Sequence, residues 1–238
     1  MKVLSIYKFA SYFLFISVLL ISCDRDELIK PVEVDLQVNM ESYQSDSKNF
    51  QSNRFLIDKG EIRFSGIEFD GKKENSDDYY FSKSFSPLLA GDLEDNSLNR
   101  NVSFDIPQGT YNPINLSLFL CNSDTIPALC LQGTYQSIQH GEVGVYFNFF
   151  RNEEMFMFKA ENTSGNKKIV LKKGEQKNLQ IDLKLQSLFR FFNPNQLESA
   201  EYINEDGNKK IIISETHNTD IYYSLVNRFK NTIHVIVK

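Results

Sequence analysis

The sequence predicts a mainly β protein, an antiparallel β-sandwich with a short α-containing segment at its C-terminal end. Apolar and polar residues alternate with a period of two in one segment after another, which is the spacing of half-buried strands. The chain contains 20 Phe and 11 Tyr, aromatic residues that favour strands. Helical segments do not regularly separate these strands, so a parallel sheet with helical crossovers is not expected.

The first element is an apolar leader, residues 1–22. Lys2 and Lys8 accompany an apolar run that is shorter than the roughly 20 residues a membrane span needs. The run ends in Leu20-Ile21-Ser22-Cys23: an aliphatic residue, a tolerant position, a small residue and a cysteine. This tetrapeptide resembles the lipobox of bacterial lipoproteins, which implies cleavage before Cys23 and acylation of that cysteine. The alternatives are an ordinary secretory signal and an N-terminal membrane anchor.

An acidic tether is predicted over residues 23–31. Asp24, Asp26 and Glu27 follow the lipobox, with Arg25 interrupting the acidic run. The cluster resembles the surface-export signal of lipoproteins from the Bacteroidota. That resemblance implies attachment to the outer membrane through the N-terminal lipid, at the cell surface rather than facing the periplasm. The alternative interpretation is a solvated linker.

The charge of the chain argues against a nucleic-acid partner. Loss of residues 1–22 removes two lysines and moves the formal net charge from -5 to -7. A nucleic-acid-binding protein needs a basic face, because it must neutralise phosphates. The acidic charge is compatible with a soluble body on a tether.

The predicted sandwich domain spans residues 32–185. Val32 to Met40 alternate strictly, and a second strand runs from Phe55 to Phe69. Gly66 shifts the phase of that second strand, which predicts a β-bulge or kink. Two hairpins are expected, one joining residues 143–149 to 155–160 and one joining 169–171 to 179–185. The remaining strands are predicted at residues 79–85, 102–106, 114–120 and 129–135.

A corner joins two of these strands at Pro107-Gln-Gly109-Thr-Tyr111. A Pro-x-Gly-x-Tyr corner between alternating strands resembles the transthyretin-like sandwiches of Bacteroidota cell-surface lipoproteins, the fimbrillin-related ones included. Such corners also occur in unrelated sandwiches of the immunoglobulin-like kind. In either case Gly109 supplies the turn and Tyr111 packs at the corner.

Cys121 and Cys130 are the two cysteines that remain once Cys23 is acylated. An even number in an oxidising compartment predicts a disulfide that closes the short loop between them. Inside this loop, Asp124-Thr125-Ile126 resembles the O-glycosylation sites of exported Bacteroidota proteins, which implies Thr125 as the acceptor. The alternative is an unmodified polar loop.

Residues 186–238 form the predicted α/β segment, either a separate appendix or a part packed on the sandwich. A helical spacing covers residues 187–192, and Asp220 is expected to cap a second short helix. Residues 211–213 and 233–237 are predicted strands.

The sequence contains no recognisable catalytic, metal or cofactor site. Nucleotide-binding, hydrolase and metalloprotease motifs are absent, and His140, His217 and His234 lack partners at metal-ligand spacing. We therefore expect a lipid-anchored, non-catalytic surface module that binds a glycan, a protein or a sister subunit. The alternative is a lipoprotein that captures haem, metal or glycan for an outer-membrane transporter. Met155, Met157 and the three histidines are the candidate ligands in that case.

Overall fold

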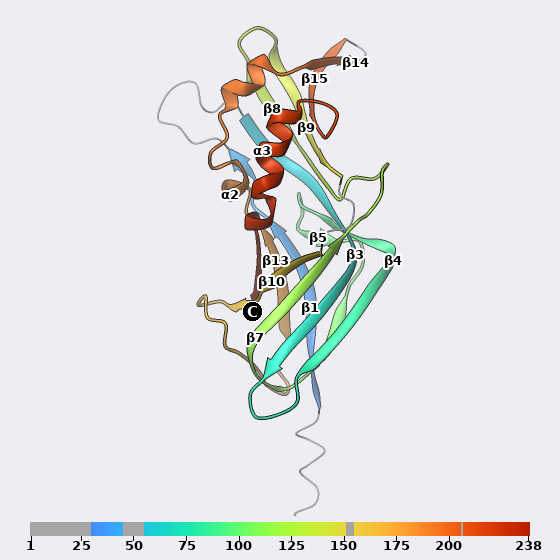
Figure 1. Ribbon diagram of the computed structural model, residues 1–238, viewed down its shortest axis with the longest axis vertical. Coiled ribbons are helices and arrows are strands. Elements are labelled where there is room, and N and C mark those ends of the chain that lie inside the picture. Colours follow the sequence, from blue (N-terminus) through green and yellow to red (C-terminus); the bar gives the residue numbers. More distant parts are fainter. Residues whose placement is uncertain (1–29, 45–54, 151–154, 206) are drawn as a thin grey trace, which may run out of the picture.

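Residues 30–44, 55–150, 155–205 and 207–238 are described by the computed structural model (Figure 1). Strands dominate and helices are short, which confirms the predicted mainly β, sandwich-like class. The strands are β1 (Pro31–Met40), β2 (Tyr43–Gln44), β3 (Phe55–Lys73), β4 (Tyr79–Asp92), β5 (Ser97–Leu98), β6 (Ser103–Pro107), β7 (Gly109–Leu120), β8 (Leu129–Ser137), β9 (Gly141–Phe149), β10 (Met155–Lys159), β11 (Glu161–Asn162), β12 (Ile169–Leu171), β13 (Lys177–Leu183), β14 (Tyr202–Glu205), β15 (Asn208–Ile213) and β16 (Ile233–Val237). The helical elements are α2 (Leu185–Phe189), η3 (Pro194–Ser199), α3 (Thr219–Phe229) and η4 (Lys230–Thr232).

The larger sheet is organised around β3, the longest strand. β7 pairs with β3 from Lys73 to Phe64, and β8 continues along the same edge from Ile62 to Phe55. β7 and β8 thus lie end to end along β3. β10 pairs with β7 and β9 pairs with β8, so β10 and β9 lie end to end in the next position of the sheet. The register shifts between Phe64 and Gly66, which confirms the predicted bulge.

The smaller sheet has the strand order β11-β16-β13-β1-β6. β1 runs parallel to β13, and parallel pairs also join β11 to β16 and β9 to β15. The expectation of a purely antiparallel sandwich is therefore wrong for these three pairs. A long stretch of chain separates the members of each pair, so hairpin geometry does not fix their direction.

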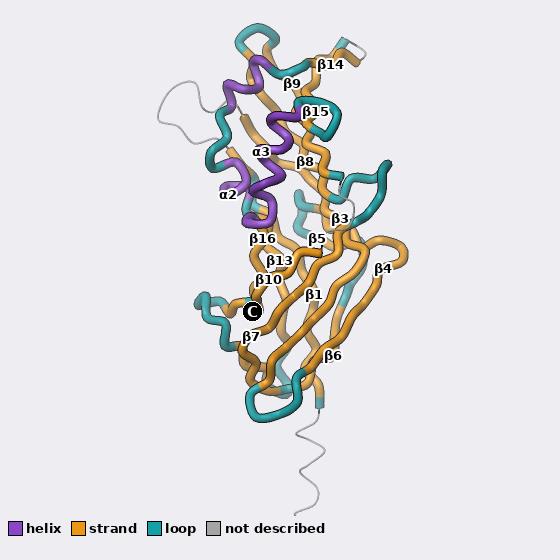
Figure 2. Tube along the Cα trace, viewed as in Figure 1, coloured by secondary structure: helices purple, strands orange, loops and turns teal. Residues whose placement is uncertain are grey.

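Two layers result, and the second layer changes character along the molecule. At one end the smaller sheet covers the larger one, where the ring centroids of Phe81 and Phe104 lie 4.9 Å apart. At the other end α2 and α3 cover it, with Phe55 5.3 Å from Phe189 and Phe149 5.0 Å from Phe229. Figure 2 shows the helices gathered at this end.

The C-terminal segment is an integral part of both sheets. β16 lies between β11 and β13, and β15 extends the larger sheet next to β9. α3 begins after Asn218, whose φ of 51° is left-handed and whose side chain makes no capping bond. Asp220 lies in the first turn of α3 instead of at its cap, so the predicted capping role is wrong.

Neither predicted hairpin forms. β9 and β10 pair with different strands, β8 and β7, and so lie end to end. β12 pairs with β7 in the larger sheet, whereas β13 joins β1 in the smaller one. The turn at Gly174, with φ of 76°, thus leads the chain from one sheet to the other.

The corner between β6 and β7 has the predicted components. Gly109 adopts a φ of 150°, and Tyr111 is completely buried. The Tyr111 hydroxyl donates a 2.6 Å hydrogen bond to the carbonyl oxygen of Pro107. The corner is therefore fixed by one buried phenol.

The Tyr111 phenol predicts a pH-dependent stability. Burial, and then the nearby Tyr79, raise the pKa of Tyr111 to about 12. Because the unfolded pKa is about 10, the stability held by the neutral phenol is complete below that pH and is lost as the pH rises towards about 12. Relative to Tyr111→Phe, the wild type should lose up to about 2 kcal/mol over this window. Urea unfolding of both proteins across this range measures the difference, and a pH-independent difference would contradict the expectation.

Candidate functional site

The outward side of the smaller sheet is densely polar, and we call it the polar face. Inward residues of the same strands are buried apolar side chains, such as Val34, Leu36, Ile181 and Val235. The alternation of each strand therefore directs its polar side chains outward. The polar face consists of Ser103 and Asp105 on β6, Glu33, Asp35, Gln37 and Asn39 on β1, Asn178, Gln180 and Asp182 on β13, and His234 and Ile236 on β16.

Strand register arranges these side chains in rows. Gln37 lies opposite Gln180, and Gln180 lies opposite Ile236. In the next row Asn39, Asp182 and His234 are neighbours across three strands. Neighbouring strands are about 4.8 Å apart, so the carboxamides and carboxylates of a row lie within reach of one ligand.

Hydrogen bonds between side chains fix the orientation of several residues of the polar face. Gln180 and Asp182 are only 8% and 9% exposed although they point outward, because side chains on β1 and β16 surround them. The Gln180 amide donates to the Asp182 carboxylate, and the Gln176 amide donates to Asp35 at 2.7 Å. These side chains therefore present fixed donors and acceptors.

His234 adds a neutral ring to the polar face. Burial, and then the positive charge of Lys184, lower the pKa of His234, whereas Glu161 and Asp182 act in the opposite direction. The net direction is downward from an ordinary value already below neutral pH. His234 therefore offers one donor and one acceptor nitrogen at neutral pH.

Two larger cavities, and a smaller one of about 110 Å³ beside Asn39 and Asp182, border the polar face. The first, of about 330 Å³, lies beside β1 and is lined by Asp35, Gln37, Asn96 and Asn101 among others. The second, of about 290 Å³, lies at the edge of β16, where His234 and Lys184 contribute to its wall. A ligand that follows the rows could extend into either hollow.

The composition of the polar face selects a ligand class. Carboxamides donate and accept at once, as hydroxyl groups do. Glu33, Asp35 and Asp105 disfavour anionic ligands, and none of the residues of the polar face is Phe, Tyr or Trp, which leaves little apolar contact. The arrangement matches an uncharged, hydroxyl-rich ligand.

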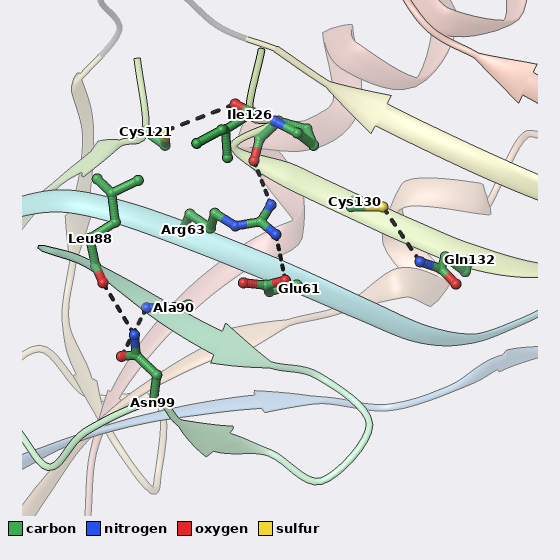
Figure 3. Close-up of polar contacts among 10 residues, drawn as sticks. Glu61, Arg63, Leu88, Ala90, Asn99, Cys121, Ile126, Cys130 and Gln132 are labelled. Atoms are coloured by element: carbon green, nitrogen blue, oxygen red, sulfur yellow. Dashed lines mark hydrogen bonds and ion pairs between the residues drawn. The ribbon is translucent and has the colours of Figure 1, made fainter. Parts of the chain in front are cut away.

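The predicted disulfide is not formed, because Cys121 and Cys130 are both free thiols. The Cys121 Sγ faces the carbonyl oxygen of Ile126, and the Cys130 Sγ faces the Gln132 amide. The Arg63 side chain lies between the two cysteines (Figure 3). Burial raises the pKa of both thiols despite this guanidinium.

Arg63 closes the loop that the disulfide was expected to close. Its backbone accepts from Cys121 N at 2.9 Å and donates to Ala128 O at 2.8 Å. Its guanidinium donates to Pro127 O at 2.8 Å and pairs with Glu61 at 2.5 Å. The prediction failed because cysteine parity carries no information about an arginine that lies far away in sequence.

Thr125 lies exposed in this loop. The Ser123 hydroxyl accepts from the backbone N–H groups of Thr125 and Ile126 at 3.2 and 3.1 Å, and lies 3.2 Å from the Thr125 hydroxyl. The Thr125 side chain is accessible to a modifying enzyme, and its glycosylation stays a prediction.

The candidate haem and metal ligands lie at separate places. His140 lies in the β8–β9 turn, His217 precedes α3, and His234 lies on β16. Met157 on β10 is exposed, and the Met155 side chain lies outside the description. Within the described ranges no three His, Cys, Asp or Glu residues gather as a metal site.

The lipobox, Leu20 to Cys23, and the acidic cluster of Asp24, Asp26 and Glu27 lie outside the described residues. β1 begins at the end of the molecule opposite α2 and α3 (Figure 1). No helix of the described part is long and apolar enough to cross a membrane.

No protein-family model, curated protein or solved structure matches the chain.

Proposed function

We propose that this is a lipid-anchored, non-catalytic protein of the outer membrane that binds a glycan on its polar face at the cell surface. The observation that carries the proposal is the set of polar rows across β1, β13 and β16, in which β1 and β13 supply the carboxamides. Sugar hydroxyls need paired donors and acceptors at close spacing, and Gln37, Asn39 and Asn178 supply them.

The anchor part of the proposal rests on the lipobox. Acylation of Cys23 with more than one chain gives stable membrane attachment, whereas one chain binds only marginally. The tether leads into β1 at the end opposite the helices, and β1 then contributes one residue to each row of the polar face. The polar face would therefore stand upright from the membrane.

Substitution of Cys23 tests the anchor. Cells fed an alkyne-tagged fatty acid should label the wild-type protein, and Cys23→Ser should lose the label and leave the membrane fraction. Cys130→Ser is the matched control and should keep both properties. Labelling of the Cys23→Ser protein would contradict the assignment.

Two carboxamides on β1 test the binding face. The double variant Gln37→Ala with Asn39→Ala removes two donors, each worth about 1 kcal/mol, so affinity should fall about tenfold or more. The control replaces Gln132 and Gln136, outward carboxamides on β8, and should bind as the wild type does. A glycan array on the mature chain finds the ligand, and calorimetry measures the three affinities.

Two outcomes would overturn the glycan proposal. Equal affinities in the wild type and the β1 double variant would move the site elsewhere. If the array shows no bound glycan and the protein self-associates as its concentration rises, a role as an assembly subunit is favoured over glycan binding.

A further inference from the structure

Two arginines converge on one exposed phenylalanine at the helical end of the molecule. Phe191 is 72% exposed. The guanidinium carbons of Arg190 and Arg228 lie 5.3 and 5.5 Å from the centroid of its ring. Arg190 follows α2 directly, and Arg228 lies in the last turn of α3. Packing of the two helices thus brings two cations to one ring.

Neither guanidinium has an anionic partner among the residues that the structure describes. The ion pairs there involve lysines or Arg63. The Nη1 atom of Arg228 is enclosed and makes no hydrogen bond within the described part of the chain. By contrast, Arg63 pairs with Glu61, and Arg100 donates to Pro87 O at 2.6 Å.

This pair of arginines stands out in an acidic chain. The formal net charge is -5, and yet two guanidinium groups lie at one ring here. Two like charges near one ring repel each other, and an anion that contacts both would reduce the repulsion. Each guanidinium is a planar fork of N–H donors that matches oxyanions.

We propose that Arg190, Arg228 and Phe191 form a binding site for a tetrahedral oxyanion, a sulfate or phosphate ester. A carboxylate is satisfied by one guanidinium fork, whereas the three free oxygens of a sulfate or phosphate ester can accept from both forks. Phe191 supplies apolar contact for the carbon skeleton that carries the ester. The site lies on other elements than the polar face, and it is positively charged, whereas the polar face carries carboxylates.

Titration of the full mature chain with inorganic sulfate, inorganic phosphate and a sulfated monosaccharide tests the site. Calorimetry at constant ionic strength, with chloride as the balancing anion, should show binding of the oxyanions. Tighter binding of the sulfated sugar would identify an ester ligand, and tighter binding of the inorganic ions would identify a free-anion site. If none of the three probes binds at constant ionic strength with chloride as the balancing anion, the proposal is overturned.

Single substitutions localise the binding. Arg228→Gln and Arg190→Gln should each lower the affinity at least about tenfold, because each removes one charged fork. Arg100→Gln is the matched control, since Arg100 also stacks on a phenylalanine, 5.8 Å from the centroid of Phe85. Arg190 is exposed, so Arg190→Gln decides the question even if Arg228→Gln disturbs folding. Unchanged affinity in Arg190→Gln would overturn the proposal, and glycan binding by the polar face should persist in that variant.

Discussion

Replacement of Gly133 by alanine is expected to destabilise the protein by about 3 kcal/mol or more, or to prevent folding. A Cβ atom at this position would lie 1.8 Å from the carbonyl oxygen of Leu56 and 2.8 Å from Cα of Ile57. Both atoms belong to the backbone of β3, beside the register shift between Ile57 and Lys59. No side chain can turn away to relieve the overlap.

Gly144 on the adjacent β9 is the matched control. A Cβ atom there meets only the ring edge of Tyr146, at 3.1 Å, and that ring can rotate. Gly144→Ala should therefore change the free energy of unfolding by less than about 1 kcal/mol. Urea unfolding of the two variants decides the matter, and equal losses would mean that β8 does not approach β3 as described.

Replacement of Arg63 by methionine is expected to cost about 2 to 4 kcal/mol. The substitution removes the bond to Pro127 O and leaves Glu61 without its cation, and bonds to charged groups contribute about 1.5 to 3 kcal/mol each. The loop over residues 121–128 should lose hydrogen-exchange protection first near Pro127, because the guanidinium bond there is lost while the backbone bonds of residue 63 to Cys121 and Ala128 remain.

The cysteines provide the contrast to Arg63. Cys130→Ser should change stability by less than about 0.5 kcal/mol, because no bridge is broken. Both Cys121 and Cys130 should react with a thiol reagent in denaturant without reductant. Protection of these thiols, or a large loss of stability in Cys130→Ser, would restore the disulfide and contradict the role given to Arg63.

The local features of the fold could be predicted from the sequence. Alternation located the strand from Val32 to Met40, and the phase change at Gly66 located a bulge. Gly109 and Tyr111 identified a corner, because a turn residue and an adjacent buried ring are both local signals. Each of these features depends on residues close together in the chain.

Strand partners could not be predicted in the same way. A period of two identifies a strand but not its neighbour or its direction, so the parallel pairing of β1 with β13 was missed. The polar face was missed for the same reason. Its signal was present in Gln37 and Asn39 on one strand and Asn178 and Gln180 on another, and only the pairing of these strands makes them one surface.

Mapping of glycan contacts by the side-chain amide resonances of the mature chain tests whether the polar face is the glycan-binding site. On titration with an oligosaccharide found by the array, the NH₂ signals of Gln37, Asn39 and Asn178 should shift together, while those of Gln132 and Gln136 on β8 should stay in place. Shifts confined to β8, or binding that leaves the three carboxamides of the polar face unchanged, would contradict the account.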